Sequence, residues 1–410
     1  MEDYKKRTSE STIEKDFLRG RGKDVLEQLA LEGFKEKLLD MLKLEIEEYL
    51  GRRRYERTNP EDKSKESIYR NGYSKQRSLS VGSGTIKLKA PRLREPYESK
   101  ILDRYQTKSE QLTEMILDLY LHGISTGDFS RFLDKMLGEE ASLSSSTIQR
   151  LKQNWEEEFK EWKTSRLKEE YLYVWADGIY PKAGPKDENM ALLVVIGVNR
   201  RGEKEILALE EGYRESYESW KDVFLQLKER GVDQLGLTIA DGIKGLWKAV
   251  MEIYPKSKQQ RCWVHKMMNI LDKVPTQVQQ EVKEDLREIY YSNSIDKSKV
   301  LIKSFKEKYS ARYPKAVNSL EEAEDRLLSY FSFPKSHWKS IKSTNPIESC
   351  FATVKLRTNA ARRIKTRASA VYLIFKVLTE SQKHWRKING HRLVKSELLK
   401  INNKNYVAAA

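Results

Sequence analysis

The first part of the chain carries a helical pattern of apolar side chains. Between Gly22 and Leu50, apolar residues recur at three- and four-residue intervals, and the centre of the stripe is formed by Phe34, Leu38, Leu42 and Ile46. This spacing predicts a long amphipathic helix or a pair of helices. No neighbouring segment offers an obvious partner for the stripe, so self-association and packing within the chain both remain open.

The spacing of apolar residues changes from helical to alternating between Arg70 and Arg94. Apolar and polar residues alternate on both sides of the turn Gly82-Ser83-Gly84, with Leu79 before the turn and Ile86 after it. Alternation around a glycine-containing turn predicts a small β-hairpin.

Residues 109–162 return to helical spacing in three stretches. The apolar stripes begin at Leu112, Phe129 and Ile148, and Gly123 and the serines 144–146 fall between them. A turn glycine and hydroxyl caps are typical of short helices joined by tight turns. The pattern therefore predicts a helix-turn-helix, with a plain three-helix packing unit as the alternative.

The middle of the chain has strand-length apolar runs. They occupy residues 171–175, 191–198 and 205–209. A further short strand is predicted at 235–240 and a last one at 259–264, while helical patterns occupy 217–230 and 243–254. The first three strands can form an antiparallel meander ahead of an α/β part, as in a ribonuclease H-like fold. From 275 to 335 the pattern is helical and rich in charge. We therefore predict an α/β core, α+β overall, with an all-helical insertion and with helical regions before it.

Charge is distributed unevenly along this pattern. The chain has 77 Lys and Arg against 61 Asp and Glu, and its formal net charge is +16. Residues 51–104 hold 15 Lys or Arg against 7 Asp or Glu, and residues 351–404 hold 14 against 2. Clustered cations release counterions from phosphate when they bind it, so these two basic blocks predict a nucleic-acid partner. The candidate phosphate contacts are Arg52, Arg53, Arg54, Lys87, Lys89, Arg92, Arg94, Lys355, Arg357, Arg362, Arg363, Lys365 and Arg367.

A helix-turn-helix would add contacts to base edges. In that motif the N-terminal residues of the last helix enter the major groove of double-stranded DNA. The candidates at these positions are Thr147, Gln149, Arg150 and Gln153.

Two aspartates follow predicted strands. Asp177 comes after the run at 171–175 and Asp241 comes after the run at 235–240, and a glycine follows each of them. Asp-Gly is also a common tight-turn dipeptide, so each aspartate taken alone has a turn as its alternative role. Together, two carboxylates delivered by one sheet can converge on a Mg²⁺ site, because Mg²⁺ takes oxygen ligands.

A third carboxylate, Glu348, lies near a predicted helix start. The order of residues predicts Asn345 as the N-cap, Pro346 as the first helical residue and Glu348 as the third, so Glu348 could return to the backbone of Asn345 in a capping box. The cations that follow it, beginning with Lys355, would instead lead a phosphate backbone to a carboxylate at this place. Both roles remain open at this point.

Several short motifs together resemble a known family. The motifs are Asp177-Gly178-Ile179-Tyr180, Asp241-Gly242-Ile243-Lys244-Gly245, Gln260-Arg261-Cys262-Trp263-Val264-His265-Lys266 and Thr344-Asn345-Pro346-Ile347-Glu348-Ser349, with Arg70-Asn71-Gly72-Tyr73 and Gly123-Ile124-Ser125-Thr126 upstream. In this order and spacing, the chain is similar to Mutator-type bacterial insertion-sequence transposases over roughly residues 45–385. Trp175 and Ala176 replace a more aliphatic approach to the first aspartate, and Pro346 stands where a small residue is frequent.

The resemblance implies a DDE transposase. Asp177, Asp241 and Glu348 would be both the catalytic residues and the ligands of two Mg²⁺ or Mn²⁺ ions per active site, in a ribonuclease H-like core. The enzyme would bind terminal inverted repeats, cleave the DNA and join the freed 3′-OH to target DNA, as a homodimer or higher oligomer. A copy-out pathway through a circular intermediate is known among such relatives.

The resemblance and the patterns together give a domain order. We expect a helical region at 1–50, a basic segment with a hairpin at 51–108, a helix-turn-helix at 109–165, the first part of the core at 166–274, the insertion at 275–335, and a last helical part with Glu348 and a basic tail at 336–410.

Two further expectations concern the cysteines and the compartment. Cys262 and His265 form a C-x-x-H pair, and two ligands fall short of the four of a structural zinc site. The resemblance places such a pair beside the catalytic core, and so implies that it supports the neighbouring carboxylates or positions DNA. The chain has two cysteines and no apolar run long enough to span a membrane, which predicts a bacterial cytoplasmic protein associated with the nucleoid.

The patterns leave two rival functions. One is a non-catalytic DNA-binding regulator that uses the helix-turn-helix and the basic blocks. The other is a ribonuclease H-like nuclease that cuts DNA without joining it.

Overall fold

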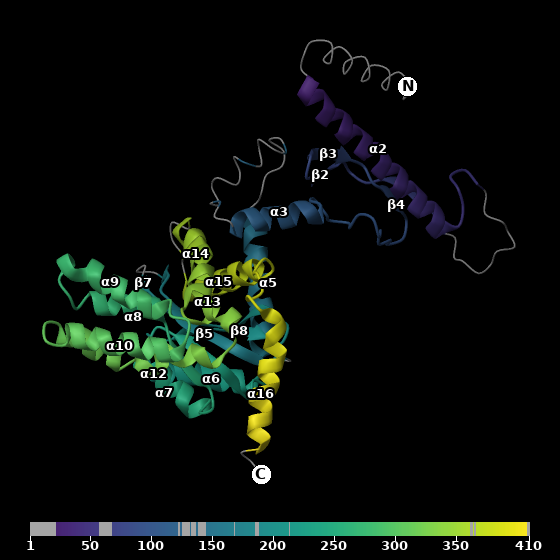
Figure 1. Ribbon diagram of the computed structural model, residues 1–410. Coiled ribbons are helices and arrows are strands. Elements are labelled where there is room, and N and C mark those ends of the chain that lie inside the picture. The colour runs from purple at the N-terminus through teal and green to yellow at the C-terminus, as the bar shows by residue number, and fades with distance from the viewer. Residues whose placement is uncertain are drawn as a thin grey trace. The chain divides into compact units, whose positions relative to one another are not determined.

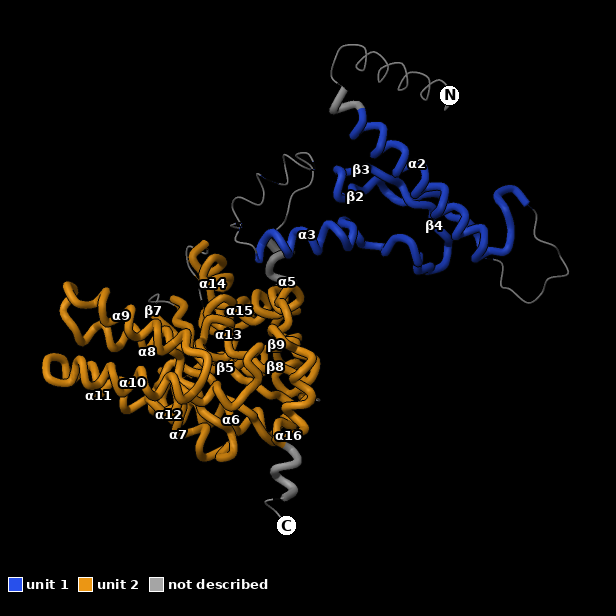
Figure 2. Tube along the Cα trace, in the orientation of Figure 1, with its two compact units in different colours: residues 1–147 blue, residues 148–410 orange. Residues whose placement is uncertain are grey.

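The structure is a computed structural model. It describes residues 22–56, 68–121, 145–167, 169–184, 188–212, 214–360 and 366–407, together with the single positions 124, 132, 137 and 364. The chain divides into two compact units, residues 1–147 and residues 148–410 (Figure 2). No helix in these ranges is long and apolar enough to cross a membrane.

The first unit combines a long helix with short strands. Helix α2 spans Gly22–Leu50, strand β2 (Arg77–Val81) pairs with β3 (Gly84–Leu88), and β1 (Arg70–Tyr73) pairs with β4 (Pro91–Leu93); both pairs are antiparallel. Helix α3 (Glu110–Leu121) follows. The predicted hairpin is confirmed as β2 and β3, and the β1–β4 pair extends it.

Three residues of the predicted apolar stripe of α2, Leu38, Leu42 and Ile46, are buried within this unit. Leu38 and Leu42 share a core cluster with Leu79, Ile86 and Leu88 of the hairpin. Packing within the chain therefore accounts for that face of the helix. Other apolar residues of α2, including Phe34 and Met41, are exposed, and self-association through them stays a prediction.

The second unit is built on a five-stranded mixed sheet (Figure 1). Its strands are β5 (Tyr171–Ile179), β8 (Ala191–Asn199), β9 (Lys204–Gly212), β10 (Leu235–Ala240) and β11 (Lys258–Arg261), in the spatial order β11-β10-β5-β8-β9. The predicted antiparallel meander is confirmed in β5, β8 and β9, and β10 lies parallel to both β5 and β11. A short pair, β6 (Lys182–Ala183) with β7 (Glu188–Asn189), branches off after β5.

Helices cover both faces of the sheet. Helices α6 (Tyr217–Glu229) and α7 (Lys244–Ile253) bury Trp220 and Trp247 in one cluster with Val174 and Ala176 of β5. Side chains alternate along a strand, so Trp175 and Asp177 face the opposite side. On this second face, α14 (Asn345–Ala360) and α16 (Val394–Val407) pack against β5, and α15 (Arg367–Gln382) packs against β9. A 3-10 turn, η3 (His391–Leu393), precedes α16.

The segment predicted to be helical at 275–335 is helical. It contains α9 (Thr276–Tyr290), α10 (Ile295–Tyr309), α11 (Pro314–Glu321), α12 (Glu324–Leu328) and the 3-10 turn η1 (Ser329–Ser332). Helices also lie outside the predicted bounds, with α8 (Trp263–Leu271) before the segment, and the 3-10 turn η2 (Lys335–His337) and α13 (Trp338–Ile341) at and after its end. Lys342, which follows α13, donates from Nζ to the Tyr290 carbonyl (2.6 Å), and its ammonium lies 4.8 Å from the Tyr290 ring and 4.5 Å from the Tyr330 ring. This contact ties α9 to the chain that leads into α14.

One strand prediction was wrong at its end. The run at 259–264 was expected to be a strand, but β11 ends at Arg261 and α8 begins at Trp263. The Cys262 N–H still bonds the Ala240 carbonyl of the sheet (2.8 Å), and the Cys262 carbonyl already accepts from Lys266 N–H (3.0 Å) as in a helix. Cys262 is therefore the point at which the chain leaves the sheet.

Helix α5 (Ser145–Thr164) is the third of the predicted helices at 109–162. Its C-terminal half packs within the second unit, where Phe159 and Trp162 contact Phe375 of α15 at ring-centroid distances of 5.2 and 4.9 Å. The stretch expected to form the second helix lies mostly outside the described residues, so the helix-turn-helix stays a prediction.

Candidate active site

Asp177 lies inside a strand and not in a turn. Strand β5 continues to Ile179 and pairs Asp177 with Val194 of β8, so the sequence-based end at residue 175 was too early and the turn alternative for Asp177 was wrong. The glycine that follows lies against another carboxylate. A Cβ at Gly178 would meet Glu215 Oε1, so a larger residue here would displace that side chain from its place beside the strand.

Asp241 follows β10 directly and does lie in a turn. Gly242 has φ +110°, and a Cβ there would come within 2.5 Å of the Arg261 guanidinium. The Ile243 N–H donates to Asp241 Oδ1 (3.2 Å) and orients the carboxylate. Because Ile239 is in register with Trp175 on the parallel neighbour β5, two further residues along each strand bring Asp241 and Asp177 to the same end of the sheet.

Glu348 lies in the first turn of α14, but it does not form the predicted capping box. The helix begins at Asn345, whose N–H bonds Ser343 Oγ (3.4 Å), and Glu348 Oε1 accepts a hydrogen bond from Thr344 Oγ1 (2.5 Å). Thr344 and not Asn345 is the last residue before the helix, so Glu348 is its fourth residue. The capping role predicted for it was therefore wrong, and its carboxylate is used elsewhere.

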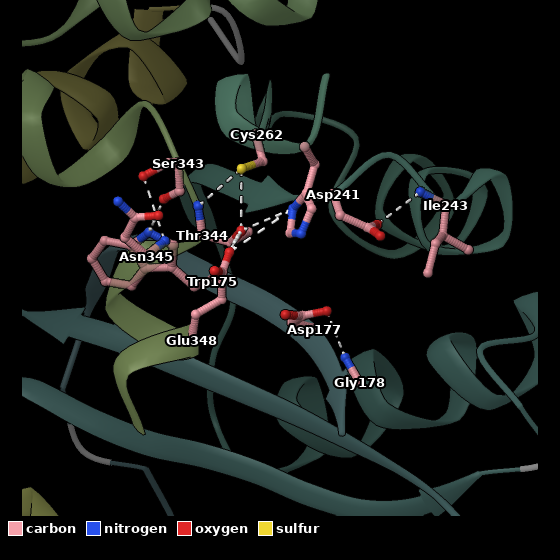
Figure 3. A network of polar contacts seen from close by, with 11 residues as sticks. Trp175, Asp177, Gly178, Asp241, Ile243, Cys262, Ser343, Thr344, Asn345 and Glu348 are labelled. Carbon is pink, nitrogen blue, oxygen red and sulfur yellow. Dashed lines mark hydrogen bonds and ion pairs between the residues drawn. The ribbon is translucent and has the colours of Figure 1, made fainter. Parts of the chain in front are cut away.

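Figure 3 shows how Asp177, Asp241 and Glu348 lie around one space. The pKa of Asp177 is raised to about 7, chiefly by burial and also by the negative charges of Asp241 and Glu215. A buried carboxyl with other carboxylates beside it is common in functional sites, and a cation among them would relieve the repulsion.

Cys262 and His265 join Glu348 at the edge of this space. The potential metal-ligand atoms of these three residues lie within 4.8 Å of one another. In the described part of the chain this is the only group of three or more such residues that could hold a metal ion, and it includes neither aspartate. His265 Nδ1 is 3.9 Å from Glu348 Oε1. The C-x-x-H pair therefore lies beside Glu348, and its role in supporting the carboxylates or positioning DNA stays a prediction.

The two side chains of this pair influence each other. A hydrogen bond with Cys262 raises the pKa of His265 to about 9 against the opposing effect of burial, and the charges of Glu348 and Asp241 also raise it. Burial acts to raise the pKa of the Cys262 thiol, but hydrogen bonds from His265 and Thr344 outweigh it and lower the pKa overall.

Sequence reasoning missed Glu215 and Tyr180. The Tyr180 hydroxyl donates to Glu215 Oε1 (2.6 Å), while Glu215 Oε2 is buried without a hydrogen-bond partner among the residues described. Tyr180 belongs to the motif that begins at Asp177 and could have been found there. Glu215 stands in the connection between β9 and α6, where no local pattern marks it, and only the folded chain brings it over Gly178.

The candidate DNA contacts have different environments. Exposed side chains are Arg53, Arg54, Lys87, Lys89, Arg92, Arg94, Lys355 and Arg367. Arg52 is half-buried, and its guanidinium and that of Arg94 lie 5.7 and 5.4 Å from the ring of Tyr69. Arg357 is buried, with 3% of its surface exposed, and so does not offer the surface contact predicted for it. Arg362, Arg363 and Lys365 lie outside the described residues, as do the side chains of Thr147, Gln149, Arg150 and Gln153.

The fold and the site together define an α/β protein with an acidic centre at one end of a mixed sheet, beside a long helical insertion. Comparison with known proteins identifies its family. The family model described as "Transposase, Mutator family" matches residues 5–388, and the chain belongs to this family.

Individual relatives agree with this assignment. The chain is 40% identical over 284 residues to the transposase for insertion sequence element IS6120 of Mycolicibacterium smegmatis, covering 69% of this chain and 88% of the relative. It is 39% identical over 256 residues to the transposase for insertion sequence element IST2 of Acidithiobacillus ferrooxidans, covering 62% and 86%. A third relative, the transposase for insertion sequence element ISRM5 of Rhizobium meliloti, is 29% identical over 355 residues, covering 86% and 87%.

Proposed function

We propose that this protein is an insertion-sequence transposase that cleaves and joins DNA with Asp177, Asp241 and Glu348 as its catalytic carboxylates. The observation that carries the proposal is the arrival of Asp177 and Asp241 on adjacent parallel strands, close enough for the charge of Asp241 to raise the pKa of Asp177. Membership of the Mutator transposase family supports it.

The catalytic unit is proposed to be ribonuclease H-like. The support is topological, because an antiparallel meander of three strands is followed by two strands parallel to the first, in the order β11-β10-β5-β8-β9. The helical segment from α9 to α13 is then an insertion between the second aspartate and Glu348.

The donor set suits Mg²⁺ or Mn²⁺. All three proposed ligands offer carboxylate oxygens, and the buried Glu215 Oε2 beside them lacks a hydrogen-bond donor from the described residues. When bound by Asp177, Asp241 and Glu348, two divalent cations would activate the attacking oxygen and stabilise the leaving oxygen of a phosphodiester.

The chain's own groups prepare this centre. The Gly178 and Ile243 N–H groups each donate to an aspartate Oδ1 and fix its orientation. The Tyr180 hydroxyl holds Glu215 in place over Gly178, so that its negative charge lies close to Asp177. These contacts fix the carboxylates before any substrate arrives.

The decisive experiment is an assay for both cleavage and joining. The substrate is a plasmid in which the DNA that flanks the gene is cloned on both sides of a marker, and the full-length protein is added with Mg²⁺ or Mn²⁺. We expect cleavage at the element ends, joining of 3′-OH ends to target DNA and, if the copy-out pathway applies, a circular intermediate. Cleavage without joining would favour a nuclease, and binding without either reaction would favour a regulator.

The pKa of Asp177 predicts how metal binding depends on pH. The carboxyl must lose its proton to bind a cation, so apparent Mg²⁺ affinity should fall as pH drops below about 7 and become nearly constant well above it. Calorimetric titration with Mg²⁺ measures this affinity. A range from pH 5.5 to pH 8.5 extends roughly one and a half units on either side of the Asp177 pKa. An affinity that does not change over this range would contradict the environment assigned to Asp177.

The exposed lysines of the hairpin predict a salt effect on DNA binding. Each phosphate contact adds about −0.9 to the slope of log K against log salt concentration. We expect Lys87→Gln and Lys89→Gln each to reduce the size of the slope by about that amount on any duplex sequence. Lys299→Gln, an exposed lysine on α10, is the matched control, and unchanged slopes in the hairpin variants would remove the hairpin from the DNA-binding surface.

A further inference from the structure

Thr344 occupies the last position before α14, and its hydroxyl has an unusual role there. Its carbonyl accepts the first helical hydrogen bonds, from Ile347 and Glu348 N–H (both 3.0 Å). A threonine at such a position normally accepts with its hydroxyl from the N–H of the second or third helical residue. Here the second residue is Pro346, which has no N–H, and the N–H of the third bonds the Thr344 carbonyl.

The hydroxyl is therefore available for side chains. Thr344 Oγ1 lies 2.5 Å from Glu348 Oε1, 3.2 Å from Cys262 Sγ and 3.3 Å from His265 Nδ1 (Figure 3). A hydroxyl has one proton and can donate to one acceptor at a time. The shortest contact, to the carboxylate, is the one in which donation is strongest, and the oxygen can then accept from His265 Nδ1–H.

The surroundings of Thr344 keep this hydroxyl in place. Thr344 is fully buried, and its backbone N–H also donates to Cys262 Sγ (3.4 Å). The preceding residue, Ser343, accepts from the indole Nε1 of Trp175 on β5 (3.2 Å). Trp263 N–H donates to the Lys342 carbonyl (3.0 Å). The segment before α14 is therefore fastened both to the strand that carries Asp177 and to the start of α8.

We propose that Thr344 is the positioning residue of the active centre, holding Glu348 by one carboxylate oxygen so that the other faces the cations. Both the hydrogen bond to Thr344 and the 3.9 Å approach of His265 use Glu348 Oε1, which leaves Oε2 for a cation. Cys262 and His265 hold the threonine from the other side. This inference rests on the proposed role of Glu348 as a metal ligand, and a group that orients a ligand in this way commonly affects metal affinity about 10- to 100-fold.

The test compares the presence and absence of the hydroxyl at constant shape. Thr344→Val replaces the hydroxyl by a methyl group, and Thr344→Ser keeps it. We expect Thr344→Val to weaken Mn²⁺ binding, measured from the electron paramagnetic resonance signal of free Mn²⁺, by about 10-fold or more and to lower kcat while KM for DNA changes little. Thr344→Ser should remain within about twofold of the unsubstituted protein in both measurements.

Controls separate the possible failures. Thr358→Val, on the same helix, removes a hydroxyl that bonds only backbone carbonyls and should change neither measurement. If Thr344→Val does not fold, Thr344→Ala replaces it in the comparison with Thr344→Ser. Equal Mn²⁺ affinity and kcat in the variants with and without the hydroxyl would overturn the inference, provided that Glu348→Gln is inactive. If Glu348→Gln is itself active, the proposed function fails and not only this inference.

Discussion

Asp177→Asn is expected to abolish DNA cleavage and joining and, at the same time, to raise the melting temperature of the metal-free protein. The amide keeps the shape of the side chain but loses the negative charge that a cation requires. We expect activity to fall by more than about a thousand-fold, because the substitution removes a ligand from the proposed two-metal centre. Measuring strand joining and thermal unfolding on the same preparations tests both effects.

The expected rise in stability follows from the pKa of Asp177. Its value in the folded protein is about 7, above the ordinary value of 3.8, so the native state binds more protons than the unfolded state between these values. The free energy of unfolding therefore decreases as pH rises from about 4 to 7, and above pH 7 the full cost of the buried charge is present. A shift of this size corresponds to a few kcal/mol, at roughly 1.4 kcal/mol per unit.

Metal should reverse the order of stability. With a chelator present at pH 8, Asp177→Asn should melt at a higher temperature than the unsubstituted protein. Saturating Mg²⁺ should stabilise only the unsubstituted protein, because a ligand that binds the native state adds to its stability. Asp222→Asn, an exposed carboxylate on α6, is the matched control. Joining activity that survives in Asp177→Asn would reject the catalytic assignment whatever the melting temperatures are.

The strands of the core could be predicted because burial on both faces leaves a simple trace in sequence. The run at 191–198 has no polar side chain and the run at 235–240 has one, Thr238, and both form strands within a residue of the predicted bounds. The end of β5 could not be predicted in the same way. Asp177 and Gly178 resemble a turn locally, and the close approach of Glu215 to Gly178 exists only in the folded chain.

The site around Glu348 shows the same limit. The sequence pattern predicts Asn345 as the N-cap, whereas Thr344 is the residue that precedes the helix in the fold. The choice is made by Cys262 and His265, about 80 residues earlier, which take the side chain of Thr344 and fix the position of the first turn. The three carboxylates proposed as catalytic were chosen from the ordered motifs, whereas the hydrogen bonds that orient them are visible only in the fold.

Arg230→Met is expected to cause the largest loss of stability among the substitutions considered. Arg230 is 8% exposed and follows α6. Its guanidinium donates to three backbone carbonyls: Nε to Ser165 (2.9 Å), Nη2 to Trp162 (3.1 Å) and Nη1 to Leu207 (2.5 Å). It also lies 5.0 Å from the ring of Trp162. Two of these carbonyls belong to the end of α5, so one side chain fastens α5 to the sheet and to α6.

Methionine would fill a similar volume and remove the charged donor from all three carbonyls. The Trp162 carbonyl keeps hydrogen bonds from the Ser165 N–H (3.2 Å) and the Ser165 Oγ (2.7 Å). The Ser165 and Leu207 carbonyls lose a donor, and unsatisfied buried acceptors cost about 1–3 kcal/mol each, so we expect a loss of about 2–4 kcal/mol and a melting temperature lower by several degrees. Arg230→Lys should fall in between, because an ammonium cannot reach three carbonyls in a fork. Arg201→Met removes an exposed arginine from a surface ion pair and should change stability by less than about 1 kcal/mol. Helix α5 also carries the predicted base contacts. Arg230→Met should therefore reduce sequence-specific DNA binding at temperatures well below the melting temperature. If the variant is clearly destabilised but its sequence specificity is unchanged, α5 does not contact the bases.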